Sequence, residues 1–137
     1  MEEREDKGRN TKIETKAFIT WLEDDVVHTK AKPGKHISLE EARANTDAVN
    51  TFYLGEKLAL LVDLTELHSI DKAARDHFSM RGRKTNVGIL AILTKTEINR
   101  FVGNFYILFS RPVVPTKLFT DEASAIEWLK ATGAGPL

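Results

Sequence analysis

Two aspartates that could take part in acid–base chemistry lie in the stretch DLTELHSID, which spans residues 63–71. A pair of carboxylates can act as general acid and general base when both reach the same substrate. Lys72 directly follows Asp71, so an enzyme that uses Asp63, Asp71 and Lys72 is one hypothesis. We favour the alternative that Asp63 ends a strand and Asp71 caps a helix, because aspartate is common at helix starts. The stretch by itself therefore predicts no catalytic residue.

Two histidines flank the same region, and imidazole is a common zinc ligand. His68 and His77 are nine residues apart, with no third ligand nearby in the sequence. This spacing does not match the usual metal motifs, so we interpret them as a loop histidine and a helix-face histidine. The sequence contains no Gly-rich phosphate loop, G-x-S-x-G elbow or H-E-x-x-H motif. We therefore predict no metal, no cofactor and no enzymatic activity.

Basic side chains gather after Asp71. Lys72 and Arg75 are followed by Arg81, Arg83 and Lys84. Such a patch can bind an anion or a phospholipid headgroup. The alternative is a solvated helix end, where the helix dipole favours cations, and we favour this interpretation.

The segment 98–109 is apolar and aromatic almost all round a predicted helix, with Phe101, Phe105, Tyr106 and Phe109 among its residues. Core packing is the default role of such side chains. A helix that is apolar all round also leaves apolar surface beyond the core. We expect that surface to serve dimerisation or an apolar, lipid-like ligand.

Composition limits the classes of protein to which the chain can belong. Its 137 residues suffice for one domain with its own core, and it contains no cysteine, which excludes disulfides and thiolate nucleophiles. Lysine plus arginine equals aspartate plus glutamate at 20 each, so the formal net charge is zero. Nucleic-acid binders usually carry a basic excess, so no nucleic-acid partner is predicted.

The two ends of the chain differ from its middle. Residues 1–11 are highly charged and predict a disordered lead-in, and residues 133–137 predict a flexible tail. The remaining residues, 12–132, predict a single domain. No apolar run approaches the roughly 20 residues that span a bilayer, and the start of the chain lacks the apolar core of a secretory signal. We therefore expect a cytoplasmic protein with no transmembrane segment.

Hydrophobic periodicity predicts the elements that would position these residues. Alternation over 13–22, with Ile13, Ala17 and Trp21 on one face, predicts a strand, and 26–30 predicts a second that pairs with it as an antiparallel hairpin. Ser38 and Glu41 have the spacing of a capping box, so a helix begins there, and Gly55 is its predicted stop.

Continuous apolar runs over 58–64 and 87–93 predict strands buried on both faces of a parallel sheet. Helices are expected at 70–78, with Ser69 or Asp71 as N-cap, and at 98–109 and 121–131, with a short strand at 117–119. The order is β-β-α-β-α-β-α-β-α. It predicts an α/β fold in which a mixed, mostly parallel sheet carries an N-terminal antiparallel hairpin and helices packed on its faces.

A strand that ends in Asp-Leu-Ser/Thr, followed by a short loop and Ile-Asp at a helix start, resembles the signature of STAS domains, a family that includes bacterial anti-sigma-factor antagonists. The resemblance covers residues 12–132. The C-terminal stretch GNFYILFSRPVVPTKLFTDEASAIEWLK is similar to a poorly characterised branch of small bacterial STAS-like proteins. The resemblance implies a partner or ligand surface formed by Asp63, Thr65, Ser69, Asp71, Lys72, Ala73 and Arg75.

The chain departs from that family at one position. In phosphorylation-switched antagonists the helix opens with Asp-Ser-Ser-Gly, and the second serine accepts the phosphate. This chain has Asp71-Lys72-Ala73-Ala74 instead, so the acceptor position falls on Ala73, which has no hydroxyl. The resemblance therefore implies a STAS-like domain without the switch.

Two functions from different classes follow. The first is a non-catalytic STAS-like regulatory or interaction module that binds a protein partner or a second copy of itself as a homodimer. The alternative is a small lipid or apolar-ligand binding protein of CRAL-TRIO-like architecture, which the apolar segment 98–109 would support.

Overall fold

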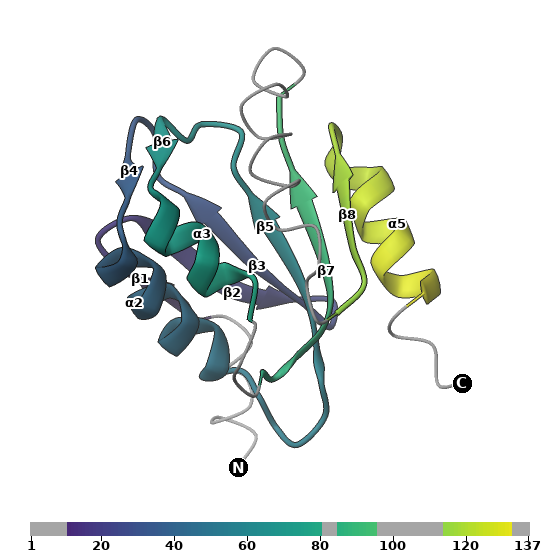
Figure 1. Cartoon of the computed structure of the whole chain (residues 1–137). Helices are drawn as coiled ribbons and strands as arrows, with labels where there is room; N and C mark the ends of the chain where they lie inside the picture. Colours follow the sequence, from purple (N-terminus) through teal and green to yellow (C-terminus); the bar gives the residue numbers. More distant parts are fainter. Residues whose placement is uncertain (1–10, 81–84, 96–113, 133–137) are drawn as a thin grey trace.

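A six-stranded sheet forms the centre of the molecule, with the strand order β1-β2-β3-β5-β7-β8 (Figure 1). The computed structural model describes residues 11–80, 85–95 and 114–132. The strands of the sheet are β1 (Lys12–Glu14), β2 (Phe18–Glu23), β3 (Val26–Ala31), β5 (Leu58–Asp63), β7 (Val87–Leu93) and β8 (Thr116–Phe119). β1, β2 and β3 pair antiparallel, whereas β3, β5, β7 and β8 pair parallel. The predicted α/β class and mixed sheet are confirmed.

Helices cover both faces of this sheet. α2 (Leu39–Asn50) and α3 (Lys72–Phe78) lie side by side on one face, and α5 (Glu122–Thr132) packs on the other (Figure 1). The alternation of side chains along a strand divides the core accordingly. Leu60 of β5 belongs to the cluster under α2 and α3, whereas the neighbouring Leu61 belongs to the cluster under α5. This explains why the apolar runs of β5 and β7 are continuous.

Several sequence predictions lie outside the described residues. These are the lead-in, apart from Thr11, the tail at 133–137, and the helix expected at 98–109 with its four aromatic residues. Among the helices that are described, none combines the length and the apolar character needed to cross a membrane.

The predicted first strand over 13–22 is wrong in one respect. A turn at residues 15–17 divides it into β1 and β2, and the backbone N–H of Thr15 donates to the carbonyl of Phe18 at 2.9 Å. β1 therefore folds back on β2, with Ile13 opposite Thr20 and Lys12 opposite Trp21. Ile13 and Trp21, expected on one face, lie on opposite faces, since a reversal of the chain breaks the two-residue period.

The first predicted helix begins where expected. Ser38 and Glu41 form the capping box, and the Ser38 N–H donates to the Glu41 carboxylate at 2.9 Å. The helix ends at Asn50, earlier than the stop expected at Gly55. Gly55 lies in the loop that follows, where its φ of 104° is a conformation that favours glycine.

A cluster of buried polar side chains connects α2 to the strands β2 and β3 by hydrogen bonds. The hydroxyls of Thr20 and Thr29 lie 2.8 Å apart, and Thr29 donates to the Asn45 side-chain oxygen at 2.6 Å. All three residues are buried. Because their polar atoms satisfy one another, the cluster holds the helix at a defined position on the sheet.

Candidate functional site

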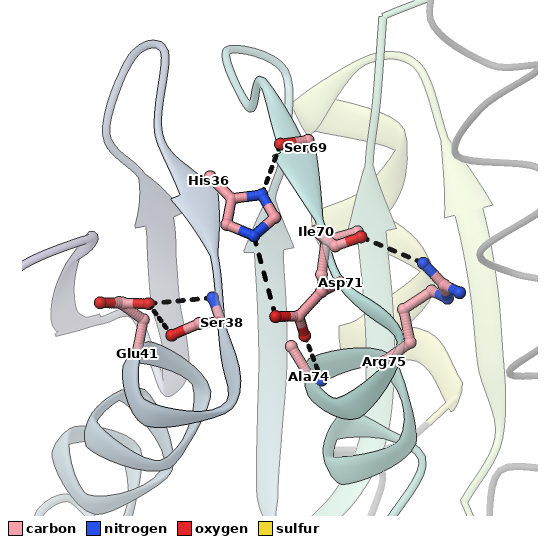
Figure 2. Close-up of polar contacts among 8 residues, drawn as sticks. All are labelled: His36, Ser38, Glu41, Ser69, Ile70, Asp71, Ala74 and Arg75. Carbon is pink, nitrogen blue, oxygen red and sulfur yellow. Dashed lines mark hydrogen bonds and ion pairs between the residues drawn. The ribbon is translucent and has the colours of Figure 1, made fainter.

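A second, two-stranded sheet lies at the starts of α2 and α3, and the sequence did not predict it. Its strands are β4 (His36–Ile37) and β6 (Ser69–Ile70), which pair in parallel with His36 opposite Ser69. The Asp71 N–H donates to the Ile37 carbonyl at 3.0 Å. This pairing brings the residue before α3 next to the residues before α2 (Figure 2).

Asp71 is the N-cap of α3. Its Oδ1 accepts the backbone N–H of Ala74 at 2.9 Å, which satisfies one of the free donors of the first turn. The sequence predicted Ser69 or Asp71 as the N-cap, and the structure shows that it is Asp71. Ser69 lies in β6, where its side chain faces β4 instead.

His36 is the residue of this site that sequence reasoning missed. Its Nδ1 lies 2.6 Å from the Ser69 hydroxyl, and its Nε2 lies 3.7 Å from Oδ2 of Asp71. Figure 2 shows the imidazole between these two side chains. A strand of two residues has no periodic pattern from which it could be predicted. The only sequence signal for His36 is its position two residues before Ser38, the N-cap of α2.

The chemistry available to this cluster is limited by its exposure. The side chains of His36 and Asp71 are 54% and 41% exposed, so water screens the charge between them. The order hydroxyl, imidazole, carboxylate is that of a nucleophile activated by a base. Here, however, Asp71 is also bound to the start of α3, and its 3.7 Å separation from His36 is longer than a hydrogen bond. The geometry is better suited to holding a surface in place.

Two cationic side chains of α3 play different roles. Arg75 donates to the Ile70 carbonyl at 3.0 Å and so braces β6 against the helix (Figure 2). Lys72 points to solvent and pairs with Asp76 at 2.9 Å across one helical turn. The other cations of the predicted basic patch, at 81, 83 and 84, lie outside the described residues.

Asp63 ends β5 and organises the loop that follows it. Its Oδ1 accepts both the N–H and the hydroxyl of Thr65, at 2.9 and 2.6 Å. Its Oδ2 lies 4.0 Å from the ammonium of Lys30. Within the described part of the chain, no hydrogen bond joins Asp63 to Asp71. The two carboxylates thus occupy the strand-end and helix-cap positions that the structural interpretation predicted.

Ala73 is exposed in the first turn of α3, beside Lys72. The two hydroxyls that precede it most closely in the sequence already have partners, because Thr65 binds Asp63 and Ser69 of β6 binds His36. Ala73, Lys72 and Asp71 thus lie together at the start of α3, where the resemblance implies a partner surface, and that role stays a prediction.

The two histidines considered as metal ligands are used otherwise. His68 is exposed, and Nε2 of His77 lies 2.7 Å from the hydroxyl of Thr46 on α2. Across residues 11–80, 85–95 and 114–132, no group of three potential ligands is placed to hold a metal.

Comparison with known proteins identifies the family. Residues 20–132 match the model of a domain of unknown function, DUF7793. Comparison with curated proteins finds no match. A solved structure, an uncharacterised protein of the DUF3478 family with a SpoIIAA-like fold from Shewanella loihica PV-4, is similar with a TM-score of 0.57 and 20% identity, over 82% of this chain and 92% of that chain. At this identity the likeness establishes the fold alone. The chain belongs to the DUF7793 family and has a SpoIIAA-like fold.

Proposed function

We propose that this STAS-like domain is a non-catalytic interaction module that binds a protein partner, or a second copy of itself, through the start of α3. The observation that carries the proposal is the exposed first turn of α3, in which Ala73 lies beside Lys72 and the capping Asp71. His36 and the β4–β6 pair hold this turn in place from outside the helix.

The absence of a switch follows from the same residues. A phosphoryl group needs a hydroxyl or another nucleophile, and Ala73 has none. Ser69 is half-buried and hydrogen-bonded to His36. A phosphate there would add about −1.5 to −2 charges close to Asp71, and the like charges would repel. The module would therefore bind its partner constitutively.

An alanine-to-arginine substitution tests the binding surface. Ala73→Arg adds bulk and charge at the exposed turn, and Ala131→Arg makes the same change on the exposed end of α5. Affinity capture from host lysate, quantified by mass spectrometry, should lose specific proteins with A73R and keep them with A131R. Light scattering over a concentration series tests self-association with the same pair of variants.

Three outcomes would contradict this proposal. One is a set of captured proteins and an oligomeric state that A73R leaves unchanged. Another is an equal loss of captured proteins with A131R and with A73R, which would show that the binding surface is not specific to the start of α3. Stoichiometric phosphate on Ser69 or on α3 after incubation with partner kinases and ATP would disprove the part of the proposal that removes the switch.

One observation favours the second candidate function, an apolar-ligand carrier. An apolar cavity of about 90 Å³ lies between α2, α3, β5 and β7. Its apolar lining consists of Val49, Leu60, Val62, Leu64, Ile70, Phe78, Met80, Val87, Leu90 and Ile92. A dry cavity of roughly 150 Å³ binds benzene, so this one suits only a smaller apolar group. Native mass spectrometry of protein purified from its host would show a bound mass if this function is correct, and an unliganded mass would count against it.

A further inference from the structure

A cleft of about 230 Å³ lies on the face of the sheet that carries α5. α5 packs on β5, β7 and β8, and the cleft lies at its first residue, between Glu122 and the middle of β3. The lining residues are Trp21, His28, Thr29, Lys30, Leu61, Asp63 and Glu122. They come from β2, β3, β5 and α5, so only the tertiary structure brings them together.

The register of the strands builds the floor of this cleft. Trp21 of β2 lies opposite His28 of β3, which in turn lies opposite Leu61 of β5. The rings of Trp21 and His28 stack with centroids 5.1 Å apart and planes 12° apart. Two residues further along the strands, Lys30 lies opposite Asp63. The Lys30–Asp63 pair is at the carboxyl end of β5, the end at which open α/β sheets commonly bind ligands.

His28 is the unusual group in this cleft. The residue is only 6% exposed, and no described residue hydrogen-bonds to its imidazole. Its ring nitrogens are not fully enclosed, because within the described residues the buried side-chain nitrogen or oxygen that lacks a hydrogen-bond partner is Nε of Arg75. The imidazole of His28 thus offers an unused donor and an unused acceptor to whatever enters the cleft.

The charges around His28 are mainly negative. Burial lowers the pKa of His28 below its ordinary value of 6.5, and the carboxylates of Glu122, Glu23 and Asp63 oppose that shift by raising it. Lys30 pairs with Asp63 at 4.0 Å. Among the described residues Glu122 has no ion-pair partner. A neutral imidazole and an uncompensated carboxylate therefore face the same space.

One cation of the chain itself already lies against the aromatic wall. The ammonium of Lys12 lies 5.0 Å from the centroid of the Trp21 ring, in a cation–π arrangement. Tryptophan is the strongest of the aromatic side chains in this interaction. Trp21 and Leu61 form an apolar wall of the cleft, and the carboxylates of Glu122 and Asp63 lie at its edge.

We propose that this cleft binds a small organic cation, an amine or a guanidine with a compact apolar body. The cationic group would lie against Glu122 and donate a hydrogen bond to the neutral imidazole of His28. The apolar body would pack on Trp21 and Leu61. The volume exceeds the roughly 150 Å³ that holds benzene, so a substituted ring fits. This site is distinct from the binding surface at α3, and the inference does not depend on the proposed function.

Three probes of similar size and different charge test the inference. Benzylamine is a cation, benzyl alcohol is neutral and benzoate is an anion. In a Trp128→Phe background, fluorescence reports on Trp21 alone, and the imidazole NMR signals report on His28. We expect benzylamine to shift both signals saturably, benzyl alcohol to bind more weakly and benzoate to have no effect.

Two matched variants locate the interaction. Glu122→Gln should weaken benzylamine binding about fivefold, as removal of a partly exposed ion pair would. Glu127→Gln makes the same change at another exposed position of α5 and should leave binding unchanged. His28→Phe keeps a stacked ring, removes the nitrogens and should also weaken binding.

The inference is overturned by any of four results: no saturable shift with benzylamine, equal binding of the three probes, preferential binding of benzoate, or equal effects of E122Q and E127Q. Because E122Q changes an exposed side chain, loss of folding does not explain a loss of binding in that variant.

Discussion

At the scale of single residues, one histidine lies in each of the two candidate sites of this domain, and no sequence motif identified either of them. His36 joins β4 to β6 on the surface, whereas His28 is buried beside Trp21 on the opposite face of the main sheet. His68 and His77 are the histidines that lie within or near the stretch DLTELHSID. Proximity in sequence to a motif therefore did not identify the two imidazoles that contact other side chains in the candidate sites.

Replacing His36 by alanine should lower the free energy of unfolding by about 1 kcal/mol, since it removes the hydrogen bond to Ser69 and leaves that hydroxyl with solvent only. His68→Ala is the matched control, because the His68 side chain is exposed and should change stability by less than about 0.5 kcal/mol. Urea unfolding followed by circular dichroism measures both. Equal effects of the two variants would show that the bond to Ser69 does not stabilise the fold.

The lowered pKa of His28 predicts a pH dependence of stability. The unfolded chain binds a proton near the ordinary pKa of 6.5, whereas the folded chain binds it only at lower pH. The stabilising contribution is thus complete above pH about 6.5 and is lost as the pH falls through the lower pKa of the folded state. Unfolding free energies at several pH values between 8 and 5 should decline less in His28→Phe than in the wild type. Parallel pH profiles of the two proteins would contradict this prediction.

At the scale of elements, helix starts position the candidate surface. The starts of α2 and α3 are both capped by polar side chains, and the parallel pairing of β4 with β6 places them together. The cap at Ser38 was predicted from local rules, whereas for α3 the sequence left Ser69 and Asp71 as alternatives and the structure selects Asp71. The pairing was not predictable, because two strands of two residues depend on contacts between segments that are distant in the sequence.

Loss of the α3 cap should destabilise the domain. Asp71→Ala removes the acceptor for the Ala74 N–H and should lower the free energy of unfolding by about 1 kcal/mol. Asp76→Ala, on the same helix, breaks only an exposed pair with Lys72, for which a loss below about 0.5 kcal/mol is expected. Chemical denaturation gives both values. A larger effect of D76A than of D71A would be inconsistent with the capping role.

At the scale of the whole molecule, the central sheet holds two cores together. The cluster beneath α2 and α3 and the cluster beneath α5 share the strands β5 and β7, whose side chains alternate between them. A disturbance in one core therefore reaches the other through the same strands.

A leucine pair tests the importance of the α5 core. Leu129 on α5 is 0% exposed, whereas Leu54 in the loop after α2 is 90% exposed. Leu129→Ala should lower the free energy of unfolding by about 2–5 kcal/mol through the cavity it leaves, and Leu54→Ala should change it by less than about 0.5 kcal/mol. Thermal unfolding monitored by two spectroscopic probes measures the loss and tests cooperativity. Separate transitions for the two probes would show that the cores unfold independently.

Much of the architecture was predictable because it depends on local patterns. The strand β7 begins and ends at the predicted residues, β5 ends one residue earlier than expected, and α5 is displaced by one residue. Continuous apolar runs identified the parallel strands because both faces of each are covered. The first strand was wrong because the turn at residues 15–17 reverses the chain without a glycine or proline to mark it.

The sequence by itself determined the α/β class, the order of the longer strands and helices that the structure describes, the Ser38 cap and the alanine at position 73, because each is encoded by neighbouring residues. Only the tertiary structure decided that His36 meets Ser69 and Asp71, and that Trp21, His28 and Glu122 line one cleft. The physical reason is strand register. Pairing between distant segments selects which strand side chains share a face, and a shift of one residue would separate Trp21 from His28 and His36 from Ser69.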